Sequence, residues 1–154
     1  MSEEPQAPQA AFSIEKIYIK DLSVEAPHSP QAFLQPESPE VEVQLQTAAN
    51  AVAEGLYEVV LTATVTARAS GRTLFLVEAA QAGLFQIRGV PEGDLEPILA
   101  IACPNILFPY ARETISDTVS RAGFPAVLLT PVNFEALYQQ RAQAQEESRI
   151  QIAH

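Results

Sequence analysis

Residues 57–68 alternate between apolar and polar side chains and are followed by the pair Ser70-Gly71. The apolar face of this segment comprises Tyr57, Val59, Leu61, Ala63, Val65 and Ala67. A period of two predicts a half-buried β-strand, and Ser-Gly is typical of a tight turn. The sequence therefore predicts a β-hairpin whose second strand spans residues 72–87. Both faces of that second strand are partly apolar, which indicates either packing on each face or a docking surface.

Two further strands are predicted before this hairpin. Residues 12–24 are rich in β-branched and aromatic side chains, and their apolar phase changes near Lys16, which indicates a β-bulge or a change of buried face. Residues 40–46 alternate strictly, with Val41, Val43 and Leu45 on one face. The segment between them, 26–39, contains four prolines. It is therefore predicted to be a stiff connection and neither a helix nor a central strand.

The second half of the chain changes to helical periodicity. Asp94 is predicted to be the N-cap of a short helix that ends near Cys103, where Pro104 and Pro109 break or kink it. An amphipathic helix follows, with apolar residues at helical spacing: Phe108, Ala111, Ile115, Val119 and Ala122. Strands first and helices afterwards predict an α+β fold with a four-stranded antiparallel sheet of meander type and two main helices.

The last helix is predicted to begin after Asn133, its N-cap, and to present Phe134, Leu137 and Tyr138 on its apolar face. Beyond Arg141 no apolar stripe continues. We therefore expect a disordered lead over residues 1–11, one domain over residues 12–141, and a flexible tail over residues 142–154.

The charge of the chain lies mainly in its first 60 residues, which contain 10 acidic and 2 basic residues against 9 and 7 in the remaining 94. With Lys16 and Lys20 as its only lysines, the chain has no basic stripe for nucleic acid or anionic lipid. The acidic excess fits either solubility alone or a basic protein partner. No apolar run has the length of a membrane span, and the N-terminus does not resemble a signal peptide, so we expect a cytoplasmic protein without membrane insertion.

The sequence contains none of the usual signatures of catalysis. The single cysteine, Cys103, is distant in sequence from both histidines, His28 and His154. A thiol nucleophile therefore lacks a histidine base, and a metal site lacks a set of Cys and His ligands. Cys103 is interpreted as a small apolar residue. Six glycines form no phosphate-binding loop, and a catalytic carboxylate pair stays open. We expect no cofactor, no bound metal and no enzymatic activity.

One stretch of the chain resembles a known family. Residues 103–113, CPNILFPYARE, followed by Val119-Ser-Arg and by Pro131-Val-Asn-Phe, are similar to the central region of the SecB protein-export chaperones. Residues 18–27, YIKDLSVEAP, and residues 57–61, YEVVL, extend the resemblance. It covers roughly residues 12–140.

The resemblance implies a fold, an assembly and an activity. The fold is a four-stranded antiparallel sheet with two helices, assembled as a dimer of dimers. The activity is that of an ATP-independent holdase, which keeps precursor proteins unfolded and delivers them to the motor SecA. The zinc of that partnership belongs to the motor.

The resemblance also implies two binding surfaces. Basic residues of SecA dock on the outer sheet face, which in this chain corresponds to Asp21, Glu25, Leu76 and Glu78. The C-terminal tail, also implicated in the family, is less acidic here than expected. Candidates for the client groove are apolar residues of the proline-rich connection, one strand face and the helix kink: Phe33, Leu34, Val41, Val43, Leu45, Phe108 and Tyr110. For each of them a core position is an equally good interpretation.

Two other interpretations stay open at this point. A SecB-like chaperone can serve a toxin–antitoxin system instead of export. An α+β domain of this size can also bind a small molecule between its helices and its sheet.

Overall fold

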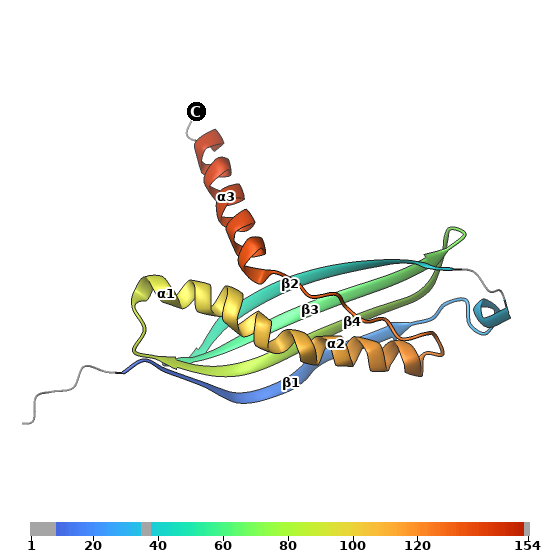
Figure 1. The fold of residues 1–154 in the computed structure, drawn as a ribbon, viewed down its shortest axis with the longest axis horizontal. Helices are drawn as coiled ribbons and strands as arrows, with labels where there is room; N and C mark the ends of the chain where they lie inside the picture. The colour runs from blue at the N-terminus through green and yellow to red at the C-terminus, as the bar shows by residue number, and fades with distance from the viewer. Residues whose placement is uncertain (1–8, 35–37, 153–154) are drawn as a thin grey trace, which may run out of the picture.

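The computed structural model describes residues 9–34 and 38–152 and shows two layers, a twisted antiparallel sheet and one long helix that crosses one of its faces (Figure 1). The helix at the C-terminus projects away from the sheet. The elements in chain order are β1 (Ala11–Glu25), η1 (Gln31–Leu34), β2 (Glu40–Ala53), β3 (Leu56–Ala69), β4 (Arg72–Arg88), α1 (Glu92–Pro97), η2 (Ile98–Ala102), α2 (Cys103–Arg121) and α3 (Phe134–Ile152).

The strand order is β1-β4-β3-β2, so the predicted meander is wrong for one strand. β2, β3 and β4 are joined by hairpins, whereas β1 lies beside β4 and leaves β2 at the opposite edge. The proline-rich connection carries the chain from one edge of the sheet to the other, which gives a Greek-key arrangement. The predicted turn is confirmed, because Ser70 and Gly71 both have positive φ, 49° and 74°.

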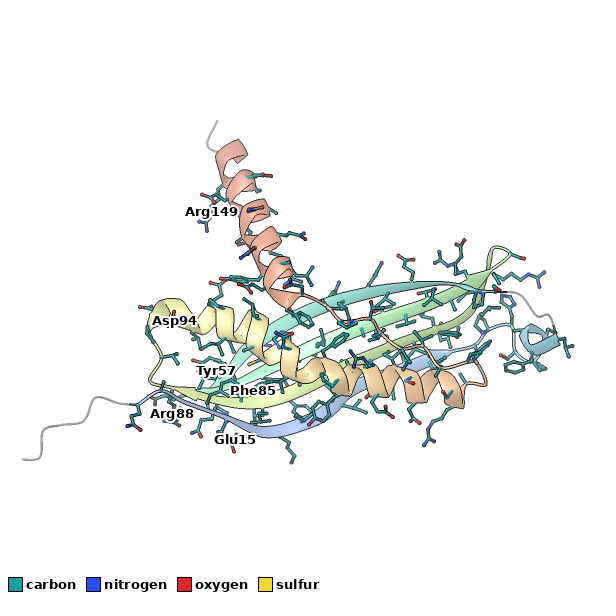
Figure 2. The ribbon with its side chains drawn as sticks, viewed as in Figure 1. Glu15, Tyr57, Phe85, Arg88, Asp94 and Arg149 are labelled. Carbon is teal, nitrogen blue, oxygen red and sulfur yellow. The ribbon has the colours of Figure 1, made fainter. Side chains whose placement is uncertain are left out.

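The two faces of the sheet differ as the alternation predicts. On the helix-side face, toward α2, every second residue of β3 from Val59 to Ala67 is buried, as are Phe75 and Val77 of β4. They form one core with α2. Phe85, labelled in Figure 2, belongs to the same core. The side chains that come from α2 are Cys103, Leu107, Phe108, Ala111, Ile115 and Val119.

β1 contains the predicted irregularity near Lys16 and a second one that the sequence did not predict. Its register against β4 shifts between Ile14 and Lys16 and again between Ile19 and Asp21. Each shift is a β-bulge. After each bulge the alternation is inverted, so the following residues lie on the face opposite to the one that strict alternation would give them. The apolar side chains of β1 therefore stay on the helix-side face along the whole strand.

The helices begin and continue differently from the prediction. Asp94 is not an N-cap, because its own N–H already donates to the Pro91 carbonyl and α1 begins at Glu92. Nor does Pro104 end the helix. The residues on both sides of η2 keep right-handed helical dihedrals, so α1, η2 and α2 are continuous. η2 is one π-helical turn, and such a turn supplies a wider hydrogen-bond spacing just where proline removes an N–H donor.

α3 begins as predicted and is longer than predicted. The side-chain oxygen of Asn133 accepts a hydrogen bond from the Ala136 N–H at 3.0 Å, which confirms the N-cap. The helix continues to Ile152, into the segment for which a flexible tail was predicted, and residues 142–149 are exposed. Arg149 lies on this distal part, far from the sheet (Figure 2). Most of the predicted N-terminal lead, residues 1–8, lies outside the described residues.

Within the described part of the chain, none of the helices combines the length and the apolar character that crossing a membrane requires.

Candidate functional site

The four residues that the resemblance assigns to SecA docking lie together on the outer sheet face, away from α2. Asp21 pairs with Ala80, and Glu25 pairs with Leu76. Ser23, between them on β1, pairs with Glu78. The four residues Asp21, Glu25, Leu76 and Glu78 are called the docking surface below. Its three carboxylates are exposed and Leu76 is half-buried, so an apolar side chain lies among acidic ones.

Hydrogen bonds and charges around the docking surface leave its acidic character intact. Glu78 accepts a hydrogen bond from Thr64 Oγ1 on β3 at 3.0 Å. Among the described residues, the ion pairs are Lys20 with Glu58 and Arg121 with Asp117, so no basic side chain there neutralises Asp21, Glu25 or Glu78. Such a surface attracts a basic partner, and the attraction weakens with salt.

A cluster that the sequence did not predict lies beside the docking surface on the same face. Tyr18 and Lys20 of β1 both donate to the carboxylate of Glu58 on β3, Lys20 at 2.7 Å. These hydrogen bonds hold the pKa of Glu58 below its usual range, while burial and the Glu58 carboxylate raise the pKa of Tyr18 to about 12. No local sequence signal predicts this cluster, because its members come from strands that are neighbours of β4 and not of each other.

On the helix-side face, an apolar cavity of about 380 Å³ contains two of the predicted groove residues, Phe33 and Val41. We call it the groove. Its aromatic wall is formed by Phe33, Phe124 and Phe75, with ring centroids 5.2 and 5.0 Å apart along the series. The remaining lining comes from η1, β4, the residues at and just before the start of β2, and the connection between α2 and α3: Ala32, Pro39, Val41, Leu74, Gly123, Pro125, Ala126 and Val127.

The other residues of the β2 face continue from the groove along the strand. Val43 is 44 % exposed on the same face as Val41. Leu45 is half-buried and lines a small cavity with Phe134, Leu137 and Tyr138 at the base of α3. Leu34 is exposed next to Phe33 but does not line the groove. The β2 face is thus an uncovered apolar strip that runs from the groove to α3.

The two candidates on α2 lie elsewhere. Phe108 is 5 % exposed, packs edge-on against Phe134 with ring centroids 6.0 Å apart, and carries the Arg112 guanidinium 4.9 Å above its ring. For Phe108 the structure therefore supports the core interpretation and corrects its assignment to the groove. Tyr110 is half exposed and does not line the groove.

The aromatic wall of the groove includes two residues that sequence reasoning missed, Phe75 and Phe124. Phe75 is buried on the helix-side face of β4, and its neighbours there depend on where the connection after α2 returns. Gly123, with φ +95°, turns that connection back toward η1, and a Cβ at this position would lie 2.9 Å from the ring of Phe33. The left-handed dihedral favours glycine at this position.

Cys103 has no role at either surface. Its side chain is fully buried in the core, and burial raises the pKa of the thiol to about 12. A thiol with that pKa is protonated at neutral pH and is not a nucleophile. This agrees with the interpretation of Cys103 as a small apolar residue.

Comparison with known proteins gives a consistent family. The family model for the preprotein translocase subunit SecB matches residues 5–145. The protein-export protein SecB of Methylobacillus flagellatus is 58 % identical over 149 residues, covering 97 % of this chain and 95 % of that protein. The protein of the same name from Dechloromonas aromatica is 61 % identical over 147 residues, covering 96 % of this chain and 97 % of that protein.

A solved structure shares the fold at low identity. The SecB-like chaperone Rv1957 of Mycobacterium tuberculosis, solved in complex with a ChAD peptide from the HigA1 antitoxin, superposes with a TM-score of 0.66 at 16 % identity. The match covers 79 % of this chain and 90 % of that one. Together with the match of the family model along nearly the whole sequence, these relatives show that the chain belongs to the SecB family of protein-export chaperones.

Proposed function

We propose that this chain is a non-enzymatic, ATP-independent holdase of the cytoplasm that keeps precursor proteins unfolded and delivers them to SecA. The observation that carries the proposal is the groove, an open apolar cavity continued by the exposed β2 strip at Val41 and Val43. An uncovered apolar surface of this kind recognises unfolded chains by their apolar side chains and not by one shape.

The position of β2 supports a second element of client recognition. β2 is an edge strand, so one side of its backbone has no partner strand among the residues that the structure describes. An extended polypeptide can form backbone hydrogen bonds along such an edge while its apolar side chains enter the neighbouring groove. Backbone hydrogen bonds do not depend on sequence, which suits a chaperone that binds many clients.

Delivery is assigned to the other face of the sheet. The docking surface lies on the outer face, whereas the groove lies on the helix-side face, so client and motor bind without competing for the same residues. The unneutralised carboxylates of Asp21, Glu25 and Glu78 suit basic residues of SecA, and Leu76 supplies an apolar anchor among them.

The assembly is proposed to be a dimer of dimers. β1 forms the other edge of the sheet and carries a row of exposed large apolar residues on its helix-side face: Phe12, Ile14, Ile19, Leu22 and Val24, exposed by 42–50 %. An edge strand with such a row is a site for association in water, and a second copy of the chain supplies a matching edge. Association of two copies along β1 would bury this row, which supports the proposed assembly.

The two alternatives are less well supported. A toxin–antitoxin role is suggested by Rv1957, which was solved with an antitoxin peptide, but at 16 % identity that likeness concerns the fold alone. The relatives at 58–61 % identity are named for protein export. A small-molecule site is not favoured, because the apolar groove is continuous with an exposed strand face and not enclosed by it.

Light scattering tests assembly and client binding together. We expect the free chain to have four times the mass of one 16.7 kDa protomer. Without nucleotide, it should form complexes of higher mass with several unrelated unfolded polypeptides and not with their folded forms. A monomer that binds none of them would exclude the holdase, and binding of a single folded or small ligand would favour the small-molecule alternative.

A further inference from the structure

The second β-bulge of β1 decides which way the docking surface faces. Ile19 pairs with Gln81 and Asp21 pairs with Ala80, so Lys20 between them has no partner of its own on β4. Without this extra residue, strict alternation would turn Asp21 and Glu25 toward α2. The acidic half of the docking surface therefore depends on a local irregularity of the backbone.

Two contacts hold the outer side of this bulge. The Nζ atom of Lys20 donates to Glu58 Oε1 at 2.7 Å, and the Tyr18 hydroxyl donates to Glu58 Oε2. The Lys20 side chain is half exposed, whereas Glu58 is only 15 % exposed. Glu58 is on β3, so both contacts cross β4 and tie the bulged strand to the centre of the sheet.

A third contact holds the bulge from the helix side. Gln81 Nε2 donates to the Tyr18 carbonyl at 3.2 Å, and Gln81 Oε1 accepts a hydrogen bond from Thr114 Oγ1 of α2 at 3.0 Å. Gln81 is 3 % exposed, and a buried amide with both ends bonded is a rigid anchor. The backbone immediately before the bulge is fixed on one face, and the bulged residue itself on the other.

We infer that Lys20 and Glu58 are positioning residues for SecA docking: their ion pair pins the bulge that turns Asp21 and Glu25 outward. The inference rests on the proposed function of the docking surface. It gives Lys20 an unexpected role, because a lysine beside three carboxylates would otherwise only weaken the attraction for a basic partner.

The direction in which one substitution changes SecA affinity separates these two roles. Lys20→Met removes a positive charge and keeps most of the aliphatic stem. If Lys20 were only an opposing charge, this variant would bind SecA more tightly. If Lys20 pins the bulge, the variant binds SecA about fivefold more weakly, although the surface has become more negative. The loss of affinity follows from the loss of one charge-assisted hydrogen bond that holds the bulge.

Calorimetric titration of purified SecA into the assembled chaperone measures the direction of this change. Glu58→Gln should weaken SecA binding in the same direction as Lys20→Met, and Lys20→Arg should restore affinity to within about twofold. Lys16→Met is the matched control, because Lys16 lies on the same strand and its side chain forms no hydrogen bond or ion pair with any described residue. It should leave SecA affinity unchanged or raise it by at most about twofold.

The outcomes distinguish this inference from the function on which it rests. Unchanged or tighter SecA binding by Lys20→Met, while amide substitution of all three docking carboxylates abolishes binding, overturns the positioning role alone. Unchanged binding after substitution of the three carboxylates overturns the docking surface and the inference with it. Affinity for an unfolded client should stay constant in every variant, and a parallel loss for SecA and client would mean that Lys20 and Glu58 only stabilise the fold.

Discussion

Replacing Asp21, Glu25 and Glu78 by their amides is expected to weaken SecA binding by about 10- to 100-fold, because three exposed charge contacts of up to about 1 kcal/mol each are removed together. Client binding should not change, since the groove lies on the opposite face of the sheet. Calorimetric titrations of the triple variant against SecA and against an unfolded precursor give both numbers. Raising the salt concentration should bring the wild-type affinity for SecA toward that of the variant.

A matched control removes the same charge elsewhere. Glu92, Asp94 and Glu96 are exposed on α1, outside the docking surface. Their replacement by amides should leave SecA affinity within about twofold of wild type, since long-range charge effects are screened at physiological salt. Equal losses in both triple variants would mean that SecA responds to total charge, and equal losses for SecA and client would mean that the docking surface is misassigned.

Val43→Asp is expected to weaken client binding by about tenfold or more, because a carboxylate that faces bound apolar segments loses water without gaining a partner, at a cost of about 2 kcal/mol or more. Val43 is 44 % exposed, so the variant should still fold and assemble. Fluorescence anisotropy of a labelled unfolded client measures the affinity, and light scattering measures the assembly.

Gln44→Asp is the control for this change. Gln44 is the next residue of β2, is exposed, and lies on the outer face opposite Thr64. The substitution Gln44→Asp introduces the same charge one position along the same edge strand, yet it should leave client affinity unchanged. If Val43→Asp prevents folding, the face of β2 is part of the core. Should both variants bind clients as the wild type does, the β2 strip does not contact them.

The strands and their faces were predictable because alternation is a local property. The two faces of β3, and the shared face of Leu76 and Glu78 on β4, follow from a period of two and the turn at Ser70-Gly71. The pairing of β1 with β4 was not predictable in this way. It depends on how the chain returns after 14 residues of proline-rich connection, and local patterns do not specify that path.

The helices and the outer face show further features that the sequence does not predict. Proline at 104 predicts a break by its missing N–H, but a π-helical turn ahead of it accommodates the loss and the helix continues. The Tyr18–Lys20–Glu58 cluster joins two strands that are not neighbours in the sheet, so neither residue type nor spacing predicts it. Phe108 is an aromatic residue near the predicted helix kink, as expected of a groove residue. Only its packing against Phe134 identifies it as part of the core.

Refolding of a fluorescent precursor in the absence of nucleotide tests holding and delivery most directly. The denatured precursor is diluted into buffer with or without the chaperone, and SecA is then added to the mixture. We expect refolding to slow in proportion to chaperone concentration until about one assembly per client is present, and SecA to join the chaperone–client complex as a ternary complex. A refolding rate that is independent of the chaperone, or a complex that SecA does not join, would contradict the account.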